Sequence, residues 1–520
     1  MQTELFEAAK LQEYNRLVAE RKASEGGEEL EGAKGGDGKG ILPFVVKPEP
    51  DGQDVTGRAG LPLVVEAFLG HGGDRLVKQH LKLKLRRRGY SEVEFVEAFL
   101  LLQAAGGEHL DDFEVLREDG GLCRLLDRQL PSPDAGRDFL LRFHDEELVK
   151  AAEQQAQQVG ELSFIPEESE ALAGLGQVHA GLMRSVADPA FGTVATLDHD
   201  ATIIDSYKQE AKWHYKGGKG YQPVAVYWAE QGLVVADEFR DGNVPAGKDN
   251  LRLIQRAFLS LPEWVTELGF RADSACYEER VLKWLANPER KAGPKGKIGF
   301  TISADMSVEL KAACEGVVEP DALGEEDEPR WQMLDDTRVN ETVEWAEIEF
   351  TPGNWPKDAK PLRYLVLRFK RRQGELFSSG ERVKHLAVVT NREEPGDEIV
   401  RWHWKKAGTI EHVHDETKNG LGAGVMPCAE FGANAAWYRI TMLTFNVLVS
   451  IKRLTLPPEQ QQVRAKRLRF LVFDLAAKIT SHARYLFSHI KDTALSRIRL
   501  LATRTWYRVQ RRGLIPVPSG

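Results

Sequence analysis

A short stretch in the middle of the chain, TVATLDHDAT at residues 193–202, constrains the fold more than any other. Apolar and β-branched residues recur along it, as is typical of a β-strand inside a sheet. The period of two places Asp198 and Asp200 on one face of this strand. Two carboxylates on one face of a central strand are costly unless they are paired or bind a metal ion. The stretch therefore predicts a site as well as a strand.

A fixed order of further elements follows this first strand. PVAVYWAE (223–230) and LVVADEF (233–239) are expected to be strands joined by a tight turn at Gln231–Gly232, and therefore antiparallel. NLRLIQRAFLSL (250–261) is expected to be a helix, and ELGFRADSACY (267–277) a fourth strand that ends in polar residues. Three strands, a helix and a strand are the first half of a ribonuclease H-like α/β fold, although other mixed folds begin in the same order.

The charge of the chain is distributed unevenly. The net charge is −9, but residues 464–512 hold thirteen Lys and Arg against two acids, so this segment carries +11 and the rest of the chain −20. A smaller basic cluster, KLKLRRR, spans Lys82–Arg88. Basic zones of this kind indicate a polyanionic partner, DNA or RNA. Solvated helix faces are the alternative explanation of such charge runs.

The chain of 520 residues is too long for one typical core, so several domains are expected. Before the first strand the pattern is helical, with a capping box at Ser91 and Glu94 and with Asp134 as the cap of a later helix. The predicted parts are an N-terminal arm with a flexible Gly-rich linker (1–57), a helical DNA-binding domain (58–185), the first part of the α/β core (186–285), a β-rich insertion (286–400), the second part of the core (401–455) and a basic helical C-terminal region (456–520).

A second carboxylate-rich stretch, GTIEHVHDETKNG at 408–420, has the pattern of a helix that ends at Asn419–Gly420. Spacings of i, i+3, i+4 and i+7 place four side chains on one face of this helix: Glu411, His414, Asp415 and Lys418. Glu416 falls on the flank and is expected in solvent. No direct role is expected for His412 or His414, because hard metal ions prefer oxygen ligands.

Carboxylates from two strands and this helix are what a two-metal phosphoryl-transfer site requires. The candidates are Asp198 or Asp200 from the first strand, Asp273 from the fourth and Glu411 from the helix. Two ions about 4 Å apart hold the attacking and leaving oxygens of an in-line displacement. Periodicity alone does not decide between Asp198 and Asp200.

At these residues the chain resembles the DDE transposases of bacterial insertion sequences, in the cut-and-paste branch with a β-rich insertion before the catalytic Glu. The motifs that carry the resemblance are TLDHDAT, GNV at 242–244, FRADSACY, TIEHVHDETKNGL and FGANAAWYRITMLTFNVL. The likeness covers roughly residue 58 to the C-terminus. It implies a ribonuclease H-like mixed sheet with a β-rich insertion domain, a helical N-terminal DNA-binding domain and a helical C-terminal region.

The resemblance also assigns roles to residues of this chain. The first catalytic and metal-binding Asp of the family, in a D-x-T motif, corresponds to Asp200, with Asp198 as alternative or supporting group, and the second corresponds to Asp273. The family's Tyr-x2-Arg-x3-Glu-x6-Lys signature falls on Trp404, Ala407, Glu411 and Lys418. Glu411 and Lys418 match, whereas Trp404 and Ala407 depart from the Tyr and Arg. Lys405 or Lys406 is expected to replace the missing Arg on a DNA phosphate.

The implied reaction is metal-dependent hydrolysis at transposon ends, followed by transfer of the freed 3′-OH into target DNA. It implies two Mg²⁺ or Mn²⁺ ions per site, double-stranded DNA as partner (terminal inverted repeats and target) and a homodimer on paired ends, without a nucleotide cofactor or a membrane. The alternatives are a non-catalytic or domesticated DNA-binding relative, and a nuclease of the same fold without strand transfer.

Basic and aromatic residues are the expected DNA contacts. Trp345, like Trp331 and Trp355, is a candidate for stacking on a base, with packing on the sheet as the alternative. The expected contacts in full are Lys418, Lys405, Lys406, Lys82, Lys84, Arg86, Arg87, Arg88, Arg464, Lys466, Arg467, Arg469 and Trp345.

The sequence also predicts a cytoplasmic protein, and the resemblance implies that it is bacterial and nucleoid-associated. The N-terminal MQTELFEAAK has acids where a signal peptide needs a basic start. The most apolar run, 437–451, is too short and too polar to span a membrane. Cys123, Cys276, Cys314 and Cys428 have no CxxC spacing, which argues against a zinc site and for a reducing compartment.

Overall fold

The computed structural model describes residues 54–83, 89–319, 330–353, 355, 361–372, 377, 382–482, 485–491 and 494–513. All of them belong to the unit Gln53–Gly520 of the two units into which the chain divides. The predicted N-terminal arm and linker therefore lie almost wholly outside the described residues.

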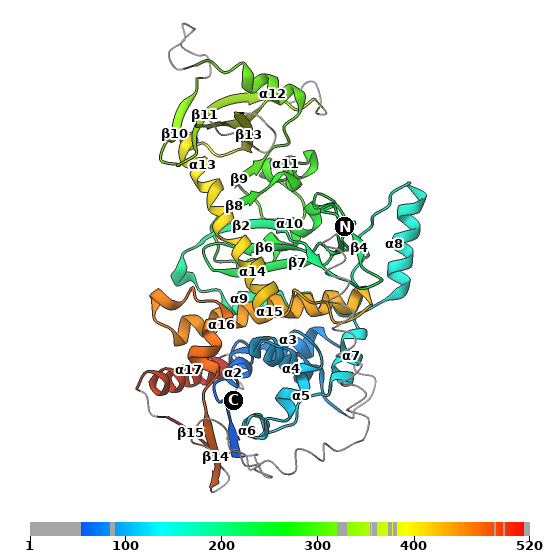
Figure 1. Ribbon diagram of the computed structural model, residues 1–520, viewed down its shortest axis with the longest axis vertical. Coiled ribbons are helices and arrows are strands. Elements are labelled where there is room, and N and C mark those ends of the chain that lie inside the picture. The colour runs from blue at the N-terminus through cyan, green and yellow to red at the C-terminus, as the bar shows by residue number, and fades with distance from the viewer. Residues whose placement is uncertain are drawn as a thin grey trace, which may run out of the picture. The chain divides into compact units, whose positions relative to one another are not determined.

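A nine-stranded mixed sheet forms the centre of this unit (Figure 1). Its strands lie in the order β10-β11-β12-β13-β9-β8-β2-β6-β7. The five strands at the β7 side are β2 (Val194–Ala201), β6 (Val224–Trp228), β7 (Leu233–Glu238), β8 (Glu267–Ala272) and β9 (Ile298–Ser303). β6 is antiparallel to both β2 and β7, whereas β2, β8 and β9 are parallel. The predicted order of three strands, a helix (α10, Asn250–Leu259) and a fourth strand is confirmed.

The segment between β2 and β6 contains a small sheet that the sequence analysis did not predict. It consists of β3 (Ile204–Asp205), β5 (Lys219–Tyr221) and β4 (Lys212–Trp213). Strands of two or three residues are too short for an alternating pattern to appear. Gly220 is required in β5, because a Cβ there would lie 2.1 Å from the backbone oxygen of Ile204.

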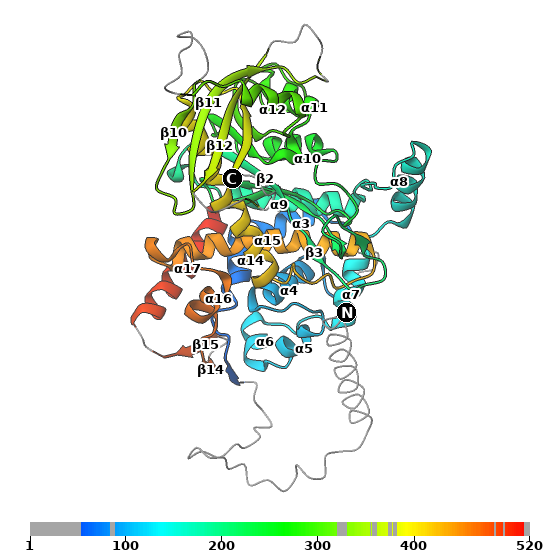
Figure 2. The ribbon, with the colours of Figure 1, turned by 45° about the horizontal axis from the view of Figure 1, so that its top comes forward.

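The strands of the predicted β-rich insertion continue the central sheet. These strands are β10 (Gln332–Asp335), β11 (Glu341–Phe350), β12 (Leu362–Arg371) and β13 (Val383–Thr390). β13 pairs antiparallel with β9, and Figure 2 shows the long β11 and β12 at the end of the sheet farthest from α15. β9, which lies after the predicted boundary at residue 286, pairs in parallel with β8. Helices α11 (Glu279–Ala286), α12 (Val308–Glu315) and α13 (Gly396–Trp404) accompany these strands.

The part before the sheet is helical, as expected. Its helices are α2 (Leu63–Gly70), α3 (Gly73–His80), α4 (Glu92–Ala105), α5 (Asp112–Arg117), α6 (Gly120–Leu126), α7 (Pro133–Leu141), α8 (Glu146–Gln158) and α9 (Glu170–Val186). The capping box at Ser91 and Glu94 is confirmed at the start of α4. Asp134 was the wrong cap for α7, because Ser132 accepts the hydrogen bond from the backbone N–H of Ala135 while Pro133 takes the first helical position.

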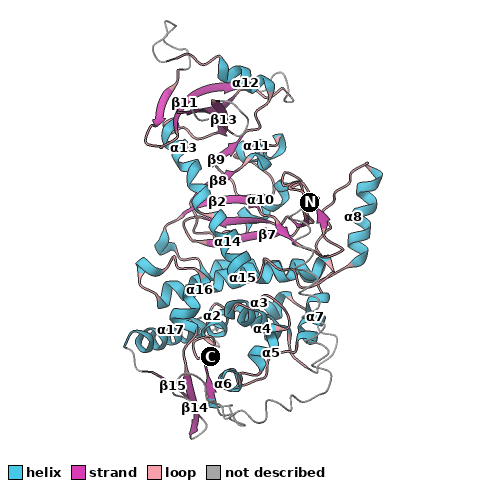
Figure 3. Ribbon diagram, in the orientation of Figure 1, coloured by secondary structure: helices cyan, strands magenta, loops and turns pink. Residues whose placement is uncertain are grey.

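Helix α15 (Phe431–Thr455) lies between the central sheet and the N-terminal helices (Figures 1 and 3). It is buried along almost its whole length, with β7 and α9 on one side and α2 and α4 on the other. Its polar residues have partners in both directions. Thr441 and Thr444 hydrogen-bond the amide of Gln103 in α4, and Asn446 bonds both backbone groups of Val234 in β7. A helix with these partners belongs to the sheet and to the N-terminal helices equally.

The C-terminal region is only partly helical, which corrects the prediction. It consists of α16 (Ala465–Leu468), a π-helical turn (Arg469–Phe473), a hairpin of β14 (Ala477–His482) and β15 (Tyr485–Ile490), and α17 (Ala494–Gly513). The short β1 (Val55–Thr56) pairs with β14, so the start of the described chain adds a strand to the hairpin. The region was predicted to be helical throughout. The segments around Ile479 and from Tyr485 to Ile490 are partly apolar, and they pair as strands.

No helix in the described part of the chain is long and apolar enough to cross a membrane. All four cysteines are free thiols and buried.

Candidate active site

Strands β2 and β8 end side by side, each at a carboxylate. In their parallel pairing His199 lies opposite Ala272. The next residues are Asp200, near the end of β2, and Asp273, directly after β8. The register therefore brings Asp200 and Asp273 to neighbouring positions at the carboxyl ends of the two strands, which is where ligands bind in many open α/β sheets.

Asp198, the alternative first carboxylate, is already paired. It is fully buried, and Arg271 of β8 donates to both of its oxygens, from Nε to Oδ1 at 2.6 Å and from Nη2 to Oδ2 at 2.8 Å. The hydroxyl of Thr409 also contacts Oδ2. Neither Arg271 nor Thr409 was singled out from the sequence. A signal for Arg271 was present in the sequence. It is an Arg within an apolar strand, and the adjacent strand carries a carboxylate that needs a partner.

Asp200 lies in a different environment from Asp198. The Nζ of Lys406 is 3.0 Å from its Oδ1, and the Nε2 of His414 is 3.6 Å from its Oδ2. His414 is buried, and both of its ring nitrogens are without a hydrogen-bond partner. Burial and the nearby lysines Lys418 and Lys406 lower the pKa of His414 to about 3, so its imidazole is neutral at pH 7.

The charges at this site influence one another. Burial raises the pKa of Asp273, the charge of Asp200 raises it further, and the charge of Lys406 opposes both. Burial alone would lower the pKa of Lys406, but the charges of Asp200 and Asp273 outweigh burial and raise it. Lys406 is therefore an ammonium ion in contact with one aspartate and close enough to compensate the other.

A family model matches the part of the chain that contains these residues. Residues 44–504 match the family model described as transposase DDE domain group 1. The chain belongs to the DDE transposase family. A comparison with curated proteins gives no match. Members of the DDE transposase family process nucleic acids and generally use divalent metal ions.

The aspartate pair of this transposase fits such an ion in part. Asp200 and Asp273 offer the carboxylate oxygens that Mg²⁺ and Mn²⁺ prefer, and their charge is compensated by the ammonium of Lys406. A third carboxylate is not with them. Across the described ranges, no group of three or more His, Cys, Asp or Glu side chains is arranged to hold a metal ion.

Helix α14 (Ile410–Gly420) carries the predicted third ligand of the transposase. Glu411 stands in its first turn with an exposed side chain. One and two turns further on, His414 contacts Asp200, and Lys418 donates from Nζ to Thr202 Oγ1 at 3.0 Å and to the Ile203 carbonyl at 3.2 Å. The face shared by Glu411, His414 and Lys418 is thus turned toward the end of β2, and Glu411 lies at its outer end.

The two other carboxylates of α14 have partners from the segment after α15 or from α15 itself. Glu416 is buried and not in solvent, because its Oε1 accepts from the backbone N–H of Ala465 in α16 at 3.0 Å and lies 3.7 Å from Lys452 Nζ. The local pattern does not reveal this contact, because Ala465 follows Glu416 by 49 residues. Asp415, predicted on the face of Glu411, forms an ion pair with Arg464 at 2.6 Å.

The basic residues expected to contact DNA divide into exposed and occupied ones. Lys82, Lys405, Lys466 and Arg467 are exposed, whereas Lys84, Arg86, Arg87 and Arg88 lie outside the described residues. Arg469 is occupied, which corrects its expected role. It donates from Nε to the Ala104 carbonyl at 2.7 Å, and from Nη2 to the carbonyls of Gln103 and Gly420. Arg469 thus caps the C-terminal ends of α4 and α14.

The tryptophans of the insertion also have structural partners. Trp345 is 9% exposed and packs in an apolar cluster with Leu365 and Ile399, its ring against Gly396. It is therefore not presented to a DNA base as expected. The Trp331 ring lies 4.3 Å from the Arg368 guanidinium and is also buried.

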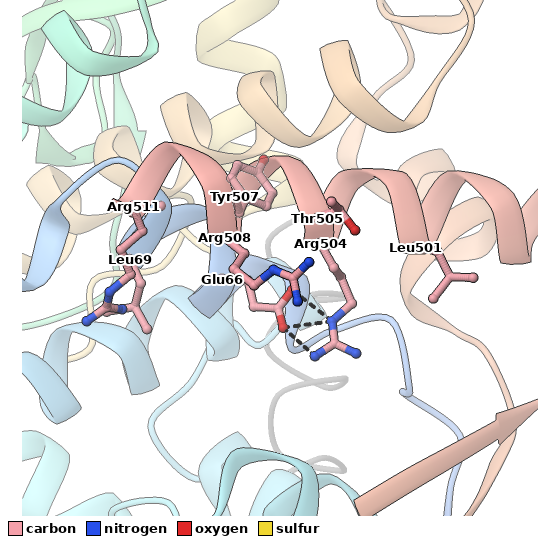
Figure 4. Close-up of a pocket in the computed structure, with 9 residues that line it drawn as sticks. Glu66, Leu69, Leu501, Arg504, Thr505, Tyr507, Arg508 and Arg511 are labelled. Atoms are coloured by element: carbon pink, nitrogen blue, oxygen red, sulfur yellow. Dashed lines mark hydrogen bonds and ion pairs between the residues drawn. The ribbon is translucent and has the colours of Figure 1, made fainter. Parts of the chain in front are cut away.

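A cavity of about 410 Å³ lies between α2 and α17 of the transposase (Figure 4). Arg504 and Arg508 of α17 line it together with Glu66 of α2, and Figure 4 shows Arg504 joined to Glu66. Arg511 pairs with Asp74 at 3.1 Å. Arg508 is exposed, and within the described part of the chain no carboxylate is paired with it. Arg508 is therefore a free cation on a basic helix.

Proposed function

We propose that this protein is a transposase that cleaves DNA at transposon ends and transfers the freed 3′-OH into target DNA. The observation that supports this most is the aspartate pair, Asp200 and Asp273, at the ends of adjacent parallel strands. The order of the five core strands, with the first strand between the second and the fourth, supports a ribonuclease H-like core. Both features are those expected of the family to which the chain belongs.

Each group near the strand ends has a distinct part in the proposed reaction. Bound divalent ions would activate water and stabilise the charge that develops on the phosphate. Asp200 and Asp273 would hold them, and Glu411, on the face of α14 that His414 and Lys418 turn toward β2, would be the third ligand. Lys418, at the end of β2, would hold a DNA phosphate, as a lysine ammonium does through charge rather than through a fixed geometry. The neutral His414 would border the site without adding charge.

DNA contacts outside the site would come from the exposed cations. Lys405 stands beside the site, whereas Lys466, Arg467 and Arg508 belong to the basic C-terminal region. We place the contacts of the C-terminal region on backbone phosphates, which position the DNA but carry no sequence information. Paired ends would require two copies of the chain, so a homodimer is part of the proposal.

Replacing Arg508 with alanine is expected to weaken DNA binding for all sequences alike, because a phosphate contact is lost. The slope of log K against log salt should become shallower by about 1. Fluorescence anisotropy with labelled duplex DNA at several salt concentrations measures both quantities. Lys150→Ala, on α8 and paired with Glu147, is the control and should leave the slope unchanged. An unchanged slope in Arg508→Ala would remove α17 from the DNA surface.

The exposed position of Glu411 is a reason to test one alternative, a non-catalytic DNA-binding protein. A non-catalytic DNA-binding relative would retain DNA affinity but would never assemble three carboxylates, and the described residues contain no such cluster. A nuclease without strand transfer would cleave but would not join the 3′-OH to a second duplex.

The deciding experiment compares Glu411→Gln with wild type on duplexes that carry the element's own ends, with and without Mg²⁺. Loss of a charged metal ligand is expected to lower the cleavage rate by about 10²-fold or more while DNA binding is retained. Glu398→Gln is the matched control, because Glu398 is also an exposed glutamate in the first turn of a helix, α13. Binding without cleavage by wild type would favour the non-catalytic relative, and cleavage without joining would favour the nuclease.

A further inference from the structure

The 3-10 turn between α13 and α14 (Lys405–Gly408) holds two lysines in opposite situations. Lys405 is exposed to solvent. The side chain of Lys406 is only 12% exposed, and its Nζ lies 3.0 Å from Asp200 Oδ1. A lysine side chain that leaves solvent loses rotamer freedom and hydration, so this position needs a compensating interaction. The carboxylates of Asp200 and Asp273 supply it.

The turn itself is attached to the strands through Thr409. The hydroxyl of Thr409 is shared between the backbone oxygen of Lys406, at 2.8 Å, and the carboxylate of Asp198. The backbone N–H of Thr409 donates to the same oxygen of Lys406 at 3.1 Å. Lys406 is therefore positioned by a hydrogen-bonded turn that is anchored on β2, and its contact with Asp200 is part of a built arrangement.

We propose that Lys406 is an internal counterion that occupies the cation position of the aspartate pair and must leave when a divalent ion binds. The inference rests on the proposed function, in which Asp200 and Asp273 hold that ion. An ammonium and a divalent cation repel each other and compete for the same oxygen of Asp200. Their binding is therefore negatively coupled, and the coupling acts equally in both directions.

The position of Lys406 in the chain gives this exchange a consequence for Glu411. Glu411 is the fifth residue after Lys406, and both lie on the segment that Thr409 fastens to β2. While Lys406 supplies one positive charge to the two aspartates, the pair keeps a net negative charge that repels a third carboxylate. Once a divalent ion replaces Lys406, the local charge becomes more positive and favours Glu411.

The test measures Mn²⁺ binding directly, by electron paramagnetic resonance of free Mn²⁺ in titrations of the full chain without DNA. Lys406→Met keeps the length of the side chain and removes its charge, so Mn²⁺ is expected to bind about tenfold tighter than to wild type. Lys405→Met, the exposed neighbour, should bind as wild type does. Equal or weaker Mn²⁺ binding by a folded Lys406→Met would overturn the inference while leaving the proposed metal site intact. An absence of Mn²⁺ binding in wild type and in Lys406→Met alike would overturn the proposed metal site, and the inference with it.

A second measurement uses wild type alone and does not depend on the folding of a variant. Acetic anhydride modifies amines in proportion to their accessibility, and mass spectrometry resolves the peptides. Acetylation of Lys406 is expected to rise when saturating Mg²⁺ is added, while acetylation of Lys405 stays constant. Unchanged protection of Lys406 under conditions where Mg²⁺ is bound would show that the lysine does not leave, and would overturn the proposal.

Discussion

Replacing Asp200 with asparagine is expected to reduce metal-dependent DNA cleavage by about 10³-fold or more, because the charge that holds the ion is lost. The fold should change little, since Asp200 lies at the end of β2 and its asparagine can still accept a hydrogen bond from Lys406. Single-turnover cleavage of end-containing duplexes measures the rate, and circular dichroism verifies the fold.

Asp198→Asn, two residues earlier on the same face, is the informative contrast. Asp198→Asn should mainly lower the free energy of unfolding, because Arg271 is left as a buried cation without its charged partner. Removing one partner of a buried ion pair lowers the free energy of unfolding by about 3–5 kcal/mol. Cleavage per folded molecule should fall much less than in Asp200→Asn. If the two variants were equally stable and Asp198→Asn lost more activity, the roles of the two aspartates would be reversed.

Replacing Arg439 with leucine is expected to destabilise the protein by about 3–5 kcal/mol, since it leaves buried carboxylates unpaired. Arg439 of α15 is 2% exposed, and its Nε lies 3.0 Å from Asp237 of β7. Its Nη2 lies 2.8 Å from Glu168, just before α9. The shift of the urea midpoint, with m constant, measures the loss. Arg117→Leu, which removes an exposed pair with Glu114 on α5, should cost less than about 1 kcal/mol.

The same network has a pH dependence of definite sign. Burial alone would raise the pKa of Glu168, but Arg439 and Arg256 lower it to about 2. Asp237 behaves in the same way, with burial outweighed by Arg439 and His179. A carboxylate with a lowered pKa contributes stability above its unfolded pKa of about 4, and this contribution is lost as the pH falls toward 2. Wild type should therefore lose stability between about pH 4 and pH 2, and Arg439→Leu should lose less over that interval. Equal pH slopes would contradict the assignment.

Much of the fold could be predicted because its pattern is local. The alternation in β2, β6 and β7 and the capping box of α4 are visible within ten residues or so, and all were confirmed. The small sheet of β3, β4 and β5 has no such pattern. The pairing of β13 with β9 was also not predictable. The composition of a strand does not show with which distant strand it will pair.

The site was predictable where residue type and strand position coincide. Asp273 could be named because it follows an apolar strand, whereas Asp200 was preferred to Asp198 only through the D-x-T motif of the family resemblance. The ion-pair partner of each aspartate could not be predicted, because it comes from a segment that is distant in the sequence. Arg271 takes Asp198 and Lys406 takes Asp200, so the two aspartates of one strand face have different surroundings. Glu416 and Arg469 were misjudged for the same reason, since each has its partner in another part of the chain.

The burial of α15 between the sheet and the N-terminal helices has a consequence for biosynthesis. The hydrogen bond from Gln103 of α4 to Trp437 of α15 joins residues 334 positions apart. A ribosome that adds 5–20 residues per second needs roughly 20 to 70 seconds to cover that distance. Helices α2 and α4 are therefore made well before α15, on which they pack. During that interval α2 and α4 have each other and α3 to pack on, but the surface that α15 covers in the folded protein has no partner.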